Sequence, residues 1–154
     1  MTGQVEAKLR DLGINLPTPP APVASYVPTV TSGNLLFVSG QITSAPEGMK
    51  FVGVVGRDMK VEDGKSAARL CAINVLAQVK AACGDLDRVK RVVKLSVYVN
   101  ATPEFTQHPE VANGASDLMV EAFGEAGKHA RAAMGAASLP RGVACEVEAI
   151  FEIA

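Results

Sequence analysis

A helical apolar stripe, followed closely by a strictly alternating segment, constrains this chain most. Between residues 62 and 83, apolar side chains recur every three or four positions, the spacing of one helix face: Ala68, Cys71, Ala72, Val75, Leu76, Val79 and Ala82. Gly84 ends this pattern. Residues 91–100 then alternate, with Val93, Leu95, Val97 and Val99 on one side and polar residues on the other. The pair predicts a long helix followed by a half-buried strand.

The remaining segments predict further strands and helices on both sides of this pair. A helix over 4–12 is expected to stop at Gly13. The other expected elements are strands at 35–38, 49–56, 129–137 and 143–153, and a second long helix at 110–123. On the last strand Val143, Cys145, Val147, Ala149, Phe151 and Ile153 share one face. Beyond the N-terminal helix the order is therefore β-β-α-β-α-β-β.

A proline-rich segment separates the N-terminal helix from the first strand. Its prolines, at positions 17, 19, 20, 22 and 28, exclude a regular helix or a central strand over residues 14–29. We expect this segment to run in an extended form over the surface of one domain. That domain spans residues 1–154, with residues 1–24 forming an N-terminal helix and proline-rich arm.

The element order predicts an α+β fold in which two helices pack on one face of a sheet. The other sheet face then stays bare, and on the last strands it mixes small, apolar and charged residues. A half-apolar open face of this size is usually covered by another subunit. We therefore expect an oligomer whose sheets meet at its centre.

Composition narrows the class of protein. With 48% hydrophobic and 20% charged residues, the 154-residue chain is globular. The net charge is −1, and the basic residues Arg88, Lys90 and Arg91 form the main cationic cluster, so nucleic acid is a weak candidate partner. No apolar run approaches the roughly 20 residues that span a membrane. The start, MTGQVEAKLRDL, does not resemble a secretory signal, and we expect a cytoplasmic protein.

Cysteine and histidine spacing does not indicate a metal site. Cys71, Cys83 and Cys145 are far apart and form no CxxC motif, so they are expected to be buried, reduced thiols. His108 and His129 are too few and too scattered for a zinc site. We expect no metal.

Three features near the strands could carry chemistry. Arg131 lies among small residues that leave room for a ligand, and a guanidinium binds a carboxylate through two parallel hydrogen bonds. Glu146 and Glu148 point the same way from the final strand, where a carboxylate can orient or deprotonate a water. Ser39 and Gly40 offer backbone groups at a point where a substrate can come close.

Each feature also has a structural interpretation. Charged residues at alternate strand positions usually form a solvated face, and Arg131 could form an ion pair with Glu146. Tyr26, which lies among prolines, is more often a packing residue than a ligand contact. Gly40 is more often a β-bulge than part of a site.

From Ser25 to the end, the chain resembles the reactive intermediate deaminase family, also called the Rid, YjgF-type or endoribonuclease L-PSP family. The resemblance rests on Tyr26 followed by SGNLLFVSGQI, the helix ending in AACG, the strand VVKLSVYV, and above all ARAAMGAASLPRGVACEVEAI. It implies a chorismate-mutase-like fold with a mixed sheet. It also implies a homotrimer whose sheets form a central β-barrel, with ligand clefts between adjacent subunits.

The activity that the resemblance implies is hydrolysis of reactive 2-enamine or 2-imine carboxylic acids, such as 2-aminoacrylate, to 2-oxo acids and ammonia, without a cofactor. Arg131 corresponds to the arginine that binds the substrate carboxylate, and Glu146 to the glutamate that orients the hydrolytic water. Tyr26, Ser39 and Gly40 correspond to substrate-contacting positions. Asn113 or Asn100 is the candidate for the family's cleft asparagine.

The chain departs from the family pattern in ways that leave the substrate open. Ala133 stands where the archetype commonly has a cysteine, the stretch from 102 to 127 is longer, and the N-terminal arm is extra. The alternatives are a non-catalytic trimer that binds small carboxylates, and a ribonuclease or translation inhibitor, as some relatives are labelled. A deaminase for an aminomuconate-like acid is a further possibility.

Overall fold

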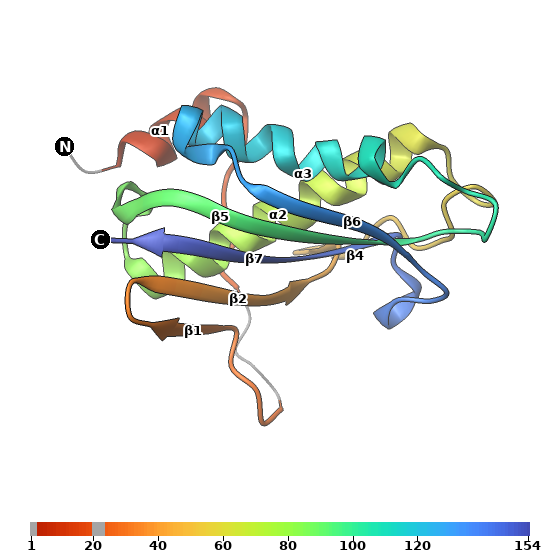
Figure 1. Cartoon of the computed structure of the whole chain (residues 1–154), viewed down its shortest axis with the longest axis horizontal. Helices are drawn as coiled ribbons and strands as arrows, with labels where there is room; N and C mark the ends of the chain where they lie inside the picture. The colour runs from red at the N-terminus through yellow and green to blue at the C-terminus, as the bar shows by residue number, and fades with distance from the viewer. Residues whose placement is uncertain (1–2, 20–23) are drawn as a thin grey trace.

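A five-stranded mixed sheet and three helices on one of its faces form the two layers of the molecule (Figure 1). The computed structural model describes residues 3–19 and 24–154. The strands of the sheet are β1 (Thr29–Ser32), β2 (Leu35–Gln41), β5 (Val89–Asn100), β6 (Ala130–Ala136) and β7 (Cys145–Ile153), and the helices are α1 (Gln4–Asp11), α2 (Val61–Cys83) and α3 (His108–Phe123). Three 3₁₀ turns lie between them, namely η1 (Leu86–Arg88), η2 (Gly124–Gly127) and η3 (Pro140–Gly142). The mixed α+β class predicted from the sequence is therefore correct.

The last strand of the chain, β7, is the central one. The sheet order is β1-β2-β7-β5-β6, and β7 pairs antiparallel with both β2 and β5. Strand β6 pairs parallel with β5, which requires the crossover through α3, and it forms one edge of the sheet. Along β6 and β7, the residues that face the helices alternate with residues that face the open side.

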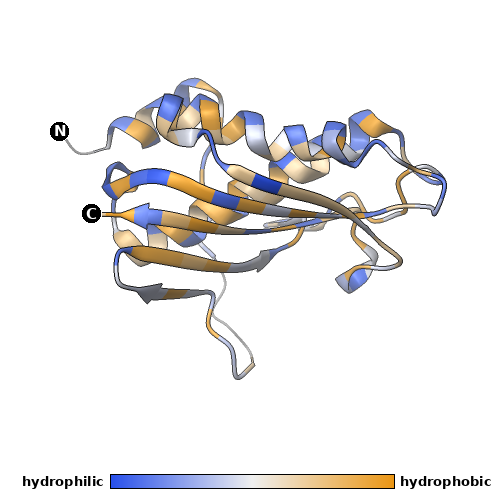
Figure 2. Cartoon of the chain, in the orientation of Figure 1, coloured by the Kyte–Doolittle hydropathy of each residue, from blue (hydrophilic) through white to orange (hydrophobic). Residues whose placement is uncertain are grey.

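Helix α2 provides most of the core that faces the sheet. Its predicted stripe is buried from Ala68 to Val79, whereas Ala82 is exposed and Cys83 takes the buried place at the end of the helix. Gly84 closes the helix with a backbone φ of 82°, as expected of a glycine stop. Figure 2 shows that β5 alternates between apolar and polar residues beneath this layer.

The predicted alternation of β5 is correct except at its start. Leu95, Val97 and Val99 are fully buried, but Val92 is the fourth core residue and Val93 is only half-buried. The register against β7 shifts between Val92 and Lys94, which marks a β-bulge. One extra residue at a bulge moves the side chains before it to the opposite face.

The prediction of a strand over 49–56 is wrong. That stretch contributes only Met49, to the small hairpin of β3 (Ser44–Ala45) and β4 (Gly48–Met49), and then forms isolated bridges at Val52 and Val55. Positive φ angles at Phe51 (50°), Gly53 (150°) and Gly56 (94°) break the extended conformation. The strand that pairs with the outer side of β2 is instead β1, and β7 pairs with its inner side.

Strand β1 begins at the end of the proline-rich segment that the sequence predicted to be extended. Thr29 is its first residue, directly after Pro28. Proline is tolerated here because β1 is an edge strand, which needs only one row of hydrogen bonds. The prolines at 20 and 22 lie outside the described residues.

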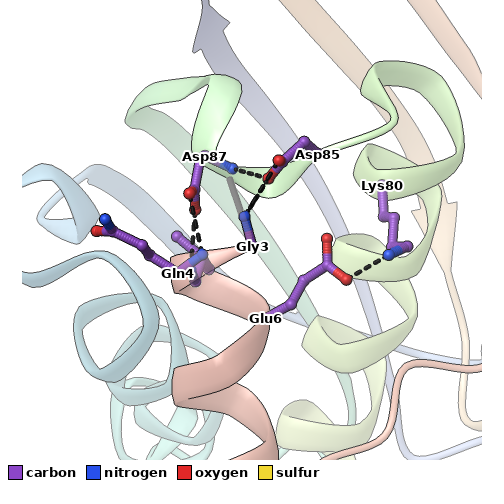
Figure 3. A network of polar contacts seen from close by, with 7 residues as sticks. Gly3, Gln4, Glu6, Lys80, Asp85 and Asp87 are labelled. Carbon is purple, nitrogen blue, oxygen red and sulfur yellow. Dashed lines mark hydrogen bonds and ion pairs between the residues drawn. The ribbon is translucent and has the colours of Figure 1, made fainter. Parts of the chain in front are cut away.

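The N-terminal helix is held by two aspartates of the η1 turn, which follows α2: Asp85, which caps the turn, and Asp87 within it (Figure 3). The Asp87 carboxylate accepts hydrogen bonds from the backbone N–H groups of Gln4 and Val5, both at 2.9 Å, and Asp85 accepts one from Gly3 at 3.2 Å. Lys80 of α2 pairs with Glu6, which also lies in the first turn of α1. These carboxylates satisfy N–H groups that a helix start leaves without partners. A third helix thus joins the two that the predicted fold class placed on this face.

The sheet face opposite the helices carries exposed apolar side chains. Val30 is 52% exposed, Phe37 40% and Met134 43%. They come from β1, β2 and β6, so apolar side chains lie near both edges of the sheet, and polar side chains of β5 and β7 such as Tyr98 and Glu148 lie between them. A half-apolar open face was expected from the sequence.

The three cysteines are buried and unpaired, as predicted. The Cys71 Sγ–H donates to the carbonyl oxygen of Cys145 at 3.3 Å, and burial raises the pKa of the Cys71 thiol well above its usual value. A thiol held in its protonated form is a poor nucleophile. None of the described helices combines the length and the apolar character that a membrane span requires.

Candidate functional site

Arg131 lies on edge strand β6 and points toward α3. Its register partner on β5 is Leu95, which is fully buried under the helices. Because paired residues of neighbouring strands share a face, Arg131 lies on the helix side of the sheet. Its side chain is exposed, because β6 has no strand beyond it in the described sheet.

One nitrogen of the Arg131 guanidinium is held by α3. Nη1 donates to Oδ1 of Asn113 at 2.8 Å and to Oγ of Ser116 at 3.1 Å. Both protons of Nη1 are therefore used. Within the part of the chain that the structure describes, the Nε and Nη2 protons have no acceptor. That edge carries two parallel N–H groups, the arrangement that binds a carboxylate through two hydrogen bonds.

His129 continues this set of contacts behind Ser116. Its Nδ1 lies 2.6 Å from the carbonyl oxygen of Gly127, and its Nε2 lies 2.8 Å from Ser116 Oγ. A carbonyl oxygen can only accept, so Nδ1 carries the proton and, in the neutral ring, Nε2 accepts the Ser116 hydroxyl proton. We call Arg131, Asn113, Ser116 and His129 the arginine cluster.

Glu146 lies on the opposite face of the sheet, on central strand β7. Its neighbours Cys145 and Val147 are buried against the helices, so its own side chain points to the open side. There it passes over Gly40 of β2, at a β-bulge between Val38 and Gln41. The predicted bulge at Gly40 is therefore present, and it brings the glycine directly beneath the glutamate.

Burial, followed by the negative charge of Glu148, raises the pKa of Glu146 above its ordinary value. Glu148 itself accepts a hydrogen bond from the Tyr98 hydroxyl at 2.7 Å. A carboxylate with a raised pKa is a stronger base once it is ionised. The open face thus carries a half-buried carboxylate that can accept a proton.

Ser39 and the segment of Tyr26 lie beside the glycine. The Ser39 hydroxyl donates to the carbonyl of Val27 at 2.8 Å, and its backbone N–H donates to the carbonyl of Pro28 at 2.9 Å. These bonds hold the segment next to Tyr26 against β2, and the Tyr26 side chain is 59% exposed. We call Tyr26, Ser39, Gly40 and Glu146 the glutamate cluster.

The predicted site residues thus form two groups on opposite faces of one sheet. The arginine cluster faces the helices at the β6 edge, and the side chains of Ser39 and Glu146 in the glutamate cluster face the open side at β2 and β7. Among the described residues of one chain Arg131 has no acidic partner, so Arg131 and Glu146 of the same chain do not form an ion pair. One chain alone does not bring the two groups together.

The structure distinguishes between the two candidate asparagines. Asn113 contacts Arg131, whereas Asn100 is buried at the end of β5, where its Nδ2 donates to the carbonyl of Val143 at 3.1 Å. Sequence reasoning overlooked Ser116 and considered His129 only as a zinc ligand. Their spacing held a signal, since Ser116 lies one helical turn after Asn113 and His129 lies two strand positions before Arg131.

The described residues contain no group of three or more His, Cys, Asp or Glu side chains that could hold a metal ion.

Proteins from several other organisms are similar to this chain over most of its length. The protein TCP17 of Trypanosoma cruzi is 52% identical over 153 residues, which cover 99% of this chain and 96% of TCP17. A crystal structure of an Agrobacterium tumefaciens protein of unknown function superposes with a TM-score of 0.92 at 48% identity, over 97% of this chain and 92% of that one. The 2-iminobutanoate/2-iminopropanoate deaminase of Dermatophagoides farinae is 29% identical over 140 residues, covering 91% of this chain and 94% of the deaminase.

A family model described as "YjgF/chorismate mutase-like, putative endoribonuclease" matches residues 6–153, which is nearly the whole chain. The match includes both clusters and all five strands of the sheet. The resemblance inferred from the C-terminal motif is therefore confirmed, and the chain belongs to the YjgF/Rid family.

Proposed function

We propose that the protein hydrolyses reactive 2-enamine and 2-imine carboxylic acids to 2-oxo acids and ammonia. The observation that carries the proposal is the free Nε and Nη2 edge of Arg131, which has the geometry of a carboxylate anchor. A distant relative bears the name of an imine deaminase. The family match covers residues 6–153 and so includes both clusters.

The reaction needs a water, a proton acceptor and an orienting charge. An enamine first gains a proton at carbon to become the imine. Water then adds to the imine carbon, and the Glu146 carboxylate takes one proton from that water and passes it to the nitrogen, which gives the neutral amino-alcohol. When the C–N bond breaks, the hydroxyl proton is also transferred to the nitrogen, so that ammonia leaves and the carbonyl of the 2-oxo acid remains. Orientation and fixed charge supply the rate enhancement.

The active unit is proposed to be a homotrimer with the site between subunits. Arg131 and Glu146 lie on opposite faces of the sheet in one chain, so a shared site requires the arginine cluster of one subunit to meet the glutamate cluster of the next. Association through the open face would bury the exposed apolar side chains of Val30, Phe37 and Met134, which favours contact between subunits there. Three such faces closing on each other would form the central barrel.

Ammonia release from freshly generated 2-iminobutanoate tests the proposal. An amino-acid oxidase can produce the imine in place, and the wild type should accelerate ammonia release over the spontaneous rate. Arg131→Ala should lose most of this acceleration through a higher KM, and Glu146→Gln should lose it through a lower kcat. Equal rates of ammonia release with wild type and Arg131→Ala would contradict the proposed deaminase activity.

Two other outcomes would identify a different function. Binding of 2-oxobutanoate without any acceleration of hydrolysis would indicate a carboxylate-binding trimer. Cleavage of RNA by highly purified protein, abolished in Glu146→Ala, would indicate the ribonuclease activity that the family description names.

A further inference from the structure

We infer that Ser116 and His129 are positioning residues that set which edge of Arg131 faces the substrate. The inference rests on the proposed function, because it assigns the carboxylate to Arg131. It goes beyond that function because the two residues do not touch the substrate themselves. They act through a directional series of hydrogen bonds that ends on the guanidinium.

The donor and the acceptor in each hydrogen bond of the series follow from the Gly127 carbonyl at one end and the Arg131 guanidinium at the other. The Gly127 carbonyl can only accept, so His129 donates to it from Nδ1 at 2.6 Å. The other nitrogen, Nε2, is then free to accept the hydroxyl proton of Ser116 at 2.8 Å. With its proton committed, Ser116 Oγ offers lone pairs, one of which accepts from Arg131 Nη1 at 3.1 Å.

His129 matters because a serine within a helix has a competing partner. A serine hydroxyl commonly donates to the carbonyl four residues earlier on its own helix, which for Ser116 is Ala112. That bond would turn the hydroxyl away from its present arrangement. By accepting the proton instead, His129 keeps the oxygen lone pairs of Ser116 directed at the guanidinium.

The consequence for the substrate is geometric. Asn113 Oδ1 takes one Nη1 proton and Ser116 takes the other, so a carboxylate reaches Arg131 only side-on, at Nε and Nη2. A planar 2-imino or 2-oxo acid bound in this way has its reactive carbon at one defined place relative to the guanidinium plane. If the hydrogen bond between Ser116 and Arg131 is lost, the guanidinium can rotate and the reactive carbon is no longer held at that place.

Affinity for 2-oxobutanoate, measured by calorimetry on the full-length protein, tests the inference without turnover. Ser116→Ala should weaken binding about tenfold, because a hydrogen bond to a charged group is lost. Ser116→Thr keeps the hydroxyl and should bind within about twofold of wild type. The change should appear in turnover as a higher KM with kcat little altered.

The histidine offers a matched pair of variants. His129→Gln carries an acceptor at about the reach of Nε2 and should retain most of the affinity, whereas His129→Asn stops at the reach of Nδ1 and should lose it as Ser116→Ala does. The Arg131 Nε–H resonance in NMR should broaden or shift in Ser116→Ala and His129→Asn only. Thermal unfolding of each variant confirms that it is folded.

The outcomes separate this inference from the proposed function. If Arg131→Ala binds 2-oxobutanoate as well as wild type does, the proposed function fails and the inference fails with it. If Arg131→Ala loses binding but folded Ser116→Ala and His129→Asn both match wild type, the anchor stands and the positioning roles are wrong.

Discussion

The carboxylate of Glu146 occupies the space in which a side chain on Gly40 would begin. A β-carbon added to Gly40 would overlap Oε2 of Glu146, and the backbone of Gly40 itself is in a conformation that any residue can adopt. Gly40→Ala should therefore fold but displace the carboxylate. We expect kcat for imine hydrolysis to fall about tenfold or more, because positioned acid–base groups contribute roughly 10²–10⁴-fold.

A second substitution tests whether the overlap with the Glu146 carboxylate causes the effect of Gly40→Ala. Asp at position 146 is one methylene shorter and draws the carboxylate back from the alanine. Thermal unfolding of Gly40→Ala alone should show a lower Tm, and the double variant Gly40→Ala/Glu146→Asp should recover part of that loss. Full activity of Gly40→Ala would contradict the proposed role of the Glu146 carboxylate as the proton acceptor.

Local sequence patterns predicted most of the helices and strands. Contacts between segments that are distant in the sequence determine how the residues of the candidate site are arranged. The period of α2 and the alternation of β7 follow from side-chain burial, so the sequence alone reveals them. The bulge before Lys94 and the positive φ at Phe51 are backbone irregularities that no apolar pattern marks. Ser116 meets His129 only because α3 folds back along β6, a relationship that the crossover creates.

The charge of Glu148 should control the pH range in which Glu146 works. Burial and Glu148 together raise the pKa of Glu146, and only the ionised form can accept a proton from water. Glu148→Gln keeps a hydrogen-bond acceptor for Tyr98 but removes the charge, so the pKa of Glu146 should fall. The acid limb of kcat/KM for imine hydrolysis should then move to lower pH.

The same shift gives a stability prediction with a defined sign. Because folding raises the pKa of Glu146, the native state holds more protons than the unfolded chain between the ordinary glutamate pKa of about 4.3 and the folded value. The contribution of Glu146 to stability therefore falls as pH rises through that window, and Glu148→Gln should weaken this fall. Glu152→Gln, farther along β7, is the control and should leave both profiles unchanged. A shift of the acid limb to higher pH in Glu148→Gln would contradict the assignment.

The open sheet face should be the trimer interface. Phe37→Glu places a charge on this face, where burial of an unpaired charge is costly. Val120→Glu is the matched control, because Val120 is 38% exposed on α3 against 40% for Phe37 on β2. In sedimentation equilibrium the wild type and Val120→Glu should have three times the mass of one chain, and Phe37→Glu should dissociate and lose imine hydrolysis. A Phe37→Glu protein that remains trimeric would place the interface elsewhere.

Asp87 should determine how firmly α1 packs on the rest of the molecule. Its carboxylate accepts from the backbone N–H groups of Val5 and Gln4, and these bonds lower its pKa. Asp87→Ala should cost about 1 kcal/mol of stability, the usual effect of removing an N-terminal helix cap. Hydrogen exchange should show lost protection that is confined to the amides of α1.

Acid should weaken the same contact in the wild type. Since folding lowers the pKa of Asp87, its stabilising effect is complete above the ordinary aspartate pKa of about 3.9 and is lost as pH falls through the lower folded value. The Asp87→Ala variant should therefore lose less stability than wild type over that acidic range. Asp11→Ala, at the other end of α1, removes a carboxylate without touching these N–H groups, and it should behave as wild type. Unchanged protection of the α1 amides in Asp87→Ala would show that the other contacts of the helix, namely the burial of Leu9, the Lys80–Glu6 ion pair and the hydrogen bond to Asp85, hold it without Asp87.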